Sequence, residues 1–270
     1  MRFDIYRIKV YKDQQMVFDH KKAKPIDILN ASMEKIHDIS IGTKLIWKIG
    51  NMSKFGDYLY YFRFGKVQKK KQGSYIDGNF INTKQKHAIY THVIMDNKNE
   101  ILAVANTGIS HNTHVIANKL EQVFNNACME GYKISIMSVK DPSKILDVFD
   151  KGESIDELWV TIKRKNNVFD DDSDFIEPLQ ELVEEIEADK IALHATGGSL
   201  NKSKTEKIIR NASTKGFKST IRTKGAKYIR AQESIASVSI TENVEDNDET
   251  KQFIHSKILQ KFDEIRLNNG

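Results

Sequence analysis

Hydrophobic and polar residues alternate over much of the first hundred positions of this chain. The segment FDIYRIKVY at residues 3–11 shows this alternation and predicts a strand. Two more strands are predicted in KLIWKIG and in the aromatic-rich DYLYYFRFGKVQKK, and HAIYTHVIM and EILAVAN flank the turn DNKN as a hairpin. One helix is predicted at residues 25–38, PIDILNASMEKIHD, which opens with proline. This region is therefore predicted to be mostly sheet.

Beyond residue 109 the pattern changes to helices alternating with strands. Helices are predicted at 112–129, 142–150, 174–187 and 203–215, and strands at 132–139, 156–163, 190–195 and 217–223. Because parallel neighbours need a crossover helix, this alternation predicts a mixed, partly parallel sheet built from βα repeats. Strand character recurs at 227–240, and a last helix is predicted at 250–267, with Phe253, Ile254, Ile258, Leu259 and Phe262 as its apolar stripe.

The expected fold class is therefore α/β, with an N-terminal part of α+β character and a C-terminal helix. Three portions follow from the patterns: a mostly β portion at 1–108, a βα-repeat portion at 109–240, and an acidic loop with the final helix at 241–270. A chain of 270 residues with 39% hydrophobic residues can bury a sizeable core.

The cysteine content and the N-terminal sequence predict a cytoplasmic protein. A single cysteine, Cys128, cannot form an internal disulfide and excludes a cysteine-built zinc site, which fits a reducing compartment. The N-terminal MRFDIYRIKVYKDQQ lacks the apolar core of a signal peptide, and no apolar run is long enough to cross a bilayer. We expect no membrane association.

Charge is distributed in two opposite blocks. Residues 166–189 hold ten acidic residues and no basic one, whereas residues 202–230 hold ten basic residues against Glu206 alone. Such blocks indicate distinct faces or distinct partners.

The basic block predicts a surface for a phosphate backbone, because each cation that meets a phosphate releases condensed counterions. On a strand at 217–223, Lys218 and Arg222 would share one face, and Tyr228 could stack a base. The alternative is a charged hairpin whose lysines protect a sheet edge. The candidate nucleic-acid-binding residues are Lys202, Lys204, Lys207, Arg210, Lys215, Lys218, Arg222, Lys224, Lys227, Tyr228 and Arg230.

Other motifs have simpler explanations. The loop TGGSLNKSK at 196–204 precedes a helix and could cradle phosphate, but Gly197 and Gly198 also suit a tight turn, with Ser199 or Asn201 as the helix cap. The carboxylates of FDDDSDF at 169–175 could hold magnesium, or cap the acidic helix that follows.

Neither the histidines nor the cysteine predicts a catalytic centre. His111 and His114 are three apart at a helix start, but no carboxylate is spaced to complete a metal set. The triplets Asp96-Asn97-Lys98 and Glu249-Thr250-Lys251 fall in predicted turns or caps, and Cys128 continues an apolar helix stripe. No metal site and no cofactor are predicted.

The order of elements over about residues 40–225 resembles an uncharacterised bacterial family known only as a domain of unknown function. The resemblance lies in an aromatic-rich strand (YLYYFRFGKV), a hairpin (HAIYTHVIMDNKNEILAV), a helix and strand region (ISIMSVKDPSKILDVF), a strand with a polar turn (LWVTIKRKNNVFDDD) and a "GF" strand (KGFKSTI). The turn here lacks the proline of that family's Arg-Pro-Asn-type turn. Proteins of this kind lie near phage-defence and mobile-element genes, so the resemblance implies a role in antiviral defence and transfers no catalytic residue.

Three functional hypotheses follow. The first is a nucleic-acid-binding component of a bacterial antiviral defence system of the abortive-infection type, using residues 202–230. The second is a metal-dependent nuclease or toxin that uses Asp170–Asp174 and the scattered histidines. The third is an oligomerising protein-interaction subunit of a defence complex, in which the acidic helix 174–187 meets a basic patch on a neighbour.

Overall fold

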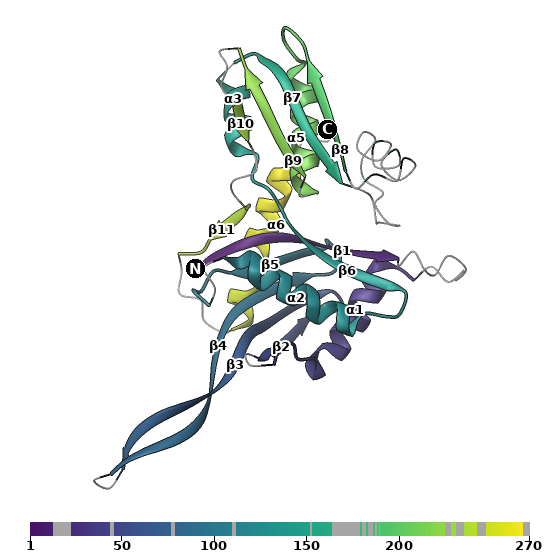
Figure 1. Cartoon of the computed structure of the whole chain (residues 1–270). Helices are drawn as coiled ribbons and strands as arrows, with labels where there is room; N and C mark the ends of the chain where they lie inside the picture. Colours follow the sequence, from purple (N-terminus) through teal and green to yellow (C-terminus); the bar gives the residue numbers. More distant parts are fainter. Residues whose placement is uncertain are drawn as a thin grey trace.

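The protein forms two sheets, one large and one small, which lie one beyond the other in the computed structural model (Figure 1). The structure describes residues 1–12, 23–43, 46–76, 79–109, 112–151, 153–163, 190–215, 217–224, 228–230, 235–241 and 247–266, with single residues 179, 182, 186 and 188. For 68–76 and 79–87 it describes the backbone. Helices combined with antiparallel sheets make this an α+β protein.

The large sheet has seven strands in the order β11-β1-β5-β4-β3-β2, and β6 also pairs with β1. Its strands are β1 (Arg2–Lys12), β2 (Ile46–Phe55), β3 (Leu59–Ile76), β4 (Asn79–Asp96), β5 (Ile101–Ala105), β6 (Tyr132–Ser138) and β11 (Ser237–Ser239). The predicted hairpin around DNKN is confirmed as β4 and β5, which pair antiparallel from Val93 with Val104 to Asp96 with Ile101.

Helices cover both faces of this sheet. On one face α1 (Pro25–Lys35), the short 3-10 helix η1 (Ile36–Asp38) and α2 (Thr113–Ala127) pack against strand residues that include Phe62 and Phe64. On the other face α6 (Asp248–Arg266) buries Ile254, Ile258 and Phe262. Because both faces are covered, every residue of β5 is buried.

The small sheet has four strands in the order β10-β9-β7-β8. These are β7 (Ile155–Lys163), β8 (Lys190–Thr196), β9 (Lys218–Thr223) and β10 (Tyr228–Arg230). One face packs against α3 (Ser143–Asp150) and α5 (Lys202–Thr214) in a separate apolar core. The predicted strands and helices around this sheet are confirmed, except helix 174–187, which lies mostly outside the described residues.

The expectation of parallel pairing is wrong for the described strands, since each of their pairings is antiparallel. The crossover helices exist, but another strand lies between the two strands that each helix connects. Helix α2 leads from β5 to β6, which both pair with β1, and α5 leads from β8 to β9, which both pair with β7. Because Lys163 pairs with Lys190, the segment between β7 and β8 leaves and returns at one end of the sheet.

The two sheets do not divide the chain at residues 108 and 240, where the sequence patterns change. Helix α2 and strands β6 and β11 belong with the large sheet, and the strand expected at 227–240 is split between the small sheet and the large one. Helix α5 meets α6 where Arg210 Nη1 donates a 2.9 Å hydrogen bond to the carbonyl oxygen of Glu264.

Candidate nucleic-acid interface

The small sheet has one apolar face and one open face. Alternation along β7 turns Leu158, Val160 and Ile162 toward α3 and α5, where they are buried. The residues that alternate with them, Glu157, Trp159 and Thr161, therefore lie on the opposite face. The neighbouring strands continue that face with the exposed residues His194 of β8 and Lys218 of β9, and we refer to it as the open face.

A strip of three aromatic rings crosses the open face. The indole of Trp159 stacks on the imidazole of His194, with ring centroids 4.3 Å apart and planes 12° apart. On its other side Trp159 meets the ring of Tyr228 at 5.6 Å between centroids and 49° between planes. Tyr228 is 57% exposed. The sheet register explains the strip, because Trp159 pairs with His194 and Tyr228 lies on the second strand away.

One buried carboxylate organises the polar side of the strip. Glu157 has a side chain only 11% exposed and accepts a 3.3 Å contact from Nε2 of His194. Its other carboxylate oxygen forms an ion pair with Nη2 of Arg222. The register places Glu157 between Arg222 and Thr196, so the pair forms directly across neighbouring strands. Glu157 thus fixes His194 and Arg222 in place.

The predicted alternation in the basic strand is confirmed. Lys218 and Arg222 lie on the open face, whereas Ser219, Ile221 and Thr223 are buried on the face that packs against the helices. Lys224, which follows β9, is exposed, and Tyr228 joins the aromatic strip. Four of the candidate residues therefore lie on or beside one surface.

The three candidate lysines of α5 do not join this surface. Lys202, Lys204 and Lys207 are exposed on α5, which covers the opposite face, so the sheet itself separates them from Lys218. The prediction of one surface across residues 202–230 is therefore wrong for these three lysines. A helix after a strand must cover one face of its sheet, and here that face is the apolar one.

Of the other four candidate cations, two are packed into the structure and two have undescribed side chains. Arg210 is held by Glu206 Oε1, at 3.0 Å from Nε and 2.8 Å from Nη2, and lies between α5 and α6. Lys215 is only 7% exposed. Lys227 lies outside the described residues, and for Arg230 only the strand is described. Arg210 and Lys215 are thus part of the packed structure.

Sequence reasoning overlooked both Trp159 and His194 as residues of a binding surface. The signal was present in LWVTIK, where Trp159 and Thr161 alternate with three apolar residues. An aromatic residue on the polar side of an amphipathic strand offers a ring on which a base could stack. Its significance needed the register that places β8 and β9 on either side of β7.

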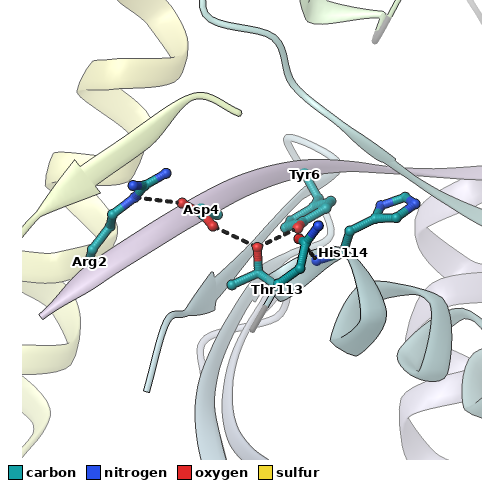
Figure 2. A network of polar contacts seen from close by, with 6 residues as sticks. Arg2, Asp4, Tyr6, Thr113 and His114 are labelled. Atoms are coloured by element: carbon teal, nitrogen blue, oxygen red, sulfur yellow. Dashed lines mark hydrogen bonds and ion pairs between the residues drawn. The ribbon is translucent and has the colours of Figure 1, made fainter. Parts of the chain in front are cut away.

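A second polar network lies at the start of α2 and has a structural role (Figure 2). The Tyr6 hydroxyl donates to Thr113 Oγ1 at 2.8 Å, and Thr113 Oγ1 donates to Asp4 Oδ2 at 2.6 Å. Arg2 Nε donates to the other oxygen of Asp4 at 2.9 Å. Burial raises the pKa of Tyr6 above its ordinary value, which keeps this hydroxyl a donor. The network fixes β1 to the helix.

The other motifs form caps and turns. Asn201 caps α5 by accepting a 3.0 Å hydrogen bond from the backbone N–H of Lys204, so the glycine loop serves as a turn and helix cap. Asn112 caps α2 in the same way through the N–H of His114, which is exposed. Cys128 is partly buried against the core, and burial raises its thiol pKa.

Two further observations concern metals and membranes. The described residues contain no group of three or more His, Cys, Asp or Glu side chains that could hold a metal ion. His111 and Asp170–Asp174 lie outside the described part of the chain, so the nuclease hypothesis stays a prediction.

None of the described helices combines the length and the apolar character that a bilayer crossing requires.

The sequence matches no protein-family model and no curated protein.

Proposed function

We propose that this protein binds single-stranded nucleic acid on the open face of its small sheet, as a cytoplasmic component of a bacterial antiviral defence system. The defence role rests on the resemblance alone. The binding role rests on one observation, the strip of Trp159, His194 and Tyr228 on a sheet face that no described helix covers.

The chemistry of the strip suits unpaired bases. Every base has a π-face, so stacking on aromatic side chains tolerates any sequence, and bases in a duplex are not accessible to it. Tyr228 at 57% exposure leaves much of its ring available for such stacking. Exposed Lys218 of β9 and Lys190 of β8 lie toward the Lys163 end of β7, and exposed Lys224 follows the opposite end of β9, so cations that can meet phosphates stand on both sides of the strip.

Intrinsic fluorescence offers a direct test, because the chain has two tryptophans and the other one, Trp47, is buried. In a Trp47→Phe background, an unstructured oligonucleotide of about twelve thymidines, enough for several stacked bases, should quench the emission of Trp159. Affinity should fall as salt rises.

The Trp159→Leu variant should bind the same oligonucleotide roughly 5- to 150-fold more weakly, which corresponds to the loss of one base stack. Phe253→Leu, which removes a 37% exposed aromatic residue of α6, is the matched control and should bind normally. Unchanged affinity in Trp159→Leu would exclude the open face as the binding site. No binding of any single strand at low salt would exclude the proposed function.

A further inference from the structure

Strands β3 and β4 continue far beyond the rest of the large sheet as a two-stranded ribbon (Figure 1). The pairing of β2 with β3 ends at Val67, and that of β5 with β4 begins at Val93. From Gln68 to Ile76 and from Asn79 to His87 the described pairing is only between β3 and β4. We call residues 68–87 the arm. Nine residue pairs at about 3.3 Å per residue give it a length of about 30 Å.

The arm is strongly cationic. It contains Lys69, Lys70, Lys71, Lys84 and Lys86 against one acidic residue, Asp77. The nearby Lys66 does not belong to this group, because its Nζ donates a 3.3 Å hydrogen bond to the carbonyl oxygen of Ile109. The five lysines carry five positive charges, as many as the net charge of +5 of the whole chain.

The register sets like charges against one another. Lys69 pairs with Lys86, and Lys71 pairs with Lys84. Positions two apart on a strand share a face, so the register assigns positions 69, 71, 84 and 86 to one face of the ribbon. Like charges directly opposite each other destabilise a strand pair, and a two-stranded ribbon without a packed layer is already marginal in water. A polyanion bound to this face would remove the repulsion.

We propose that the arm is a second nucleic-acid site, which binds duplex DNA or RNA through its phosphate backbone. A two-stranded ribbon fits the major groove of B-DNA, which is about 12 Å wide. The length of the arm, about 30 Å, is close to one helical turn. Lysines without a fixed base partner would give sequence-independent binding. This site differs from the open face in position, in residues and in the form of nucleic acid that it takes.

The test replaces all five arm lysines with Gln and measures binding of a 20-base-pair DNA duplex and a 20-base-pair RNA duplex by fluorescence anisotropy at several salt concentrations. On B-DNA the slope of log K against log salt should become shallower by up to about 4.5, at 0.9 for each phosphate contact that is lost. The matched control replaces five exposed lysines elsewhere, Lys35, Lys151, Lys204, Lys207 and Lys257, and loses the same charge. It should keep most of the duplex affinity.

A second variant guards against misfolding of the lysine variant. Residues 68–87 are replaced by Asn-Gly, so that Val67 and Ala88, which pair in the native register, flank a two-residue hairpin turn. This variant should keep the thermal midpoint of the wild type within a few degrees and lose duplex binding.

Several outcomes would overturn the proposal. One is an unchanged duplex affinity with an unchanged salt slope in both arm variants. Another is a loss of duplex affinity in the matched control that equals the loss in the arm variant. Aggregation of the lysine variant with normal duplex binding would identify the lysines as protection of a sheet edge. Dimers that disappear when the arm is removed, without any duplex binding, would identify a second copy as the partner. Single-strand binding by Trp159→Leu reports separately on the open face, so failure of either site can be recognised.

Discussion

The indole of Trp159 lies parallel to the imidazole of His194, on neighbouring antiparallel strands, with 4.3 Å between their centroids. Beneath this pair, Glu157 accepts from His194 and forms an ion pair with Arg222. The ion pair with Glu157 therefore engages the guanidinium of Arg222, which could otherwise bind a phosphate.

Glu157→Gln should strengthen binding of single-stranded oligonucleotides. The substitution removes the negative charge that faces Arg222, so the guanidinium can pair with a phosphate, and the salt slope should steepen by about 0.7 for one added contact. Titrations at three salt concentrations measure both effects. Glu153→Gln, an exposed site before β7, is the control for the change in net charge. Weaker binding by Glu157→Gln would indicate that the position of His194 matters more than the release of Arg222.

The network at the start of α2 predicts an order of stabilities (Figure 2). Tyr6→Phe removes one neutral hydrogen bond and should lower the free energy of unfolding by about 0.5–1.5 kcal/mol. Thr113→Val should cost more, about 1–3 kcal/mol, because it leaves the buried Asp4 carboxylate without the Thr113 donor. Urea denaturation measures both values. Thr113→Ser keeps the hydroxyl and should remain closest to the wild type, and equal losses in all three variants would contradict this reading.

Asp96 and His255 connect the β4–β5 turn to α6, and they predict a pH dependence of stability. His255 Nε2 lies 2.8 Å from Asp96 Oδ2, and Oδ1 accepts from the backbone N–H groups of Lys98 and Asn99 at 3.0 Å. Burial raises the pKa of Asp96, but the hydrogen bonds from His255 and Asn99 outweigh it and hold that pKa below its ordinary value of 3.8.

A carboxylate whose pKa is lower in the folded state stabilises the fold above its ordinary pKa, and this stabilisation disappears as the pH falls through the folded value. Asp96→Asn should therefore lower the free energy of unfolding at pH 7 by about 1.5–3 kcal/mol. The difference from the wild type should shrink as the pH falls below about 4. Denaturation curves at pH 7, 5 and 3 measure this, and a difference that stays constant with pH would contradict it.

Gly65 tolerates no side chain. A Cβ at this position of β3 would overlap the carbonyl oxygen of Ile89 and lie 2.8 Å from the Cα of Tyr90. These are backbone atoms of the neighbouring strand, so relief requires a shift of β4, and Gly65→Ala should cost about 1–3 kcal/mol. Gly50→Ala is the matched control, since nothing lies within 4 Å of its Cβ. Thermal unfolding of the two variants should separate them clearly.

Much of the fold could be predicted because its signals are local. Alternation marked β1, the turn DNKN marked the hairpin of β4 and β5, and a proline at the first position marked α1. In α6 the apolar spacing identified Ile254, Ile258 and Phe262 as the buried stripe, but Phe253 is 37% exposed, since the stripe is narrower than the pattern of apolar residues. The side of β9 that carries Lys218 and Arg222 also follows from period two alone.

The rest of the fold, and the composition of the candidate site, depended on which strands pair with each other. Residue periodicity fixes what each segment becomes, but it does not encode the neighbours of a strand, which are set by packing between residues far apart in the chain. Only the tertiary structure placed β1 between β5 and β6, and β7 between β8 and β9, which made the sheets antiparallel. The same pairing brought Trp159 next to His194 and put the α5 lysines on the opposite face of the sheet from Lys218. Among the described strands it also paired the two strands of the cationic arm only with each other.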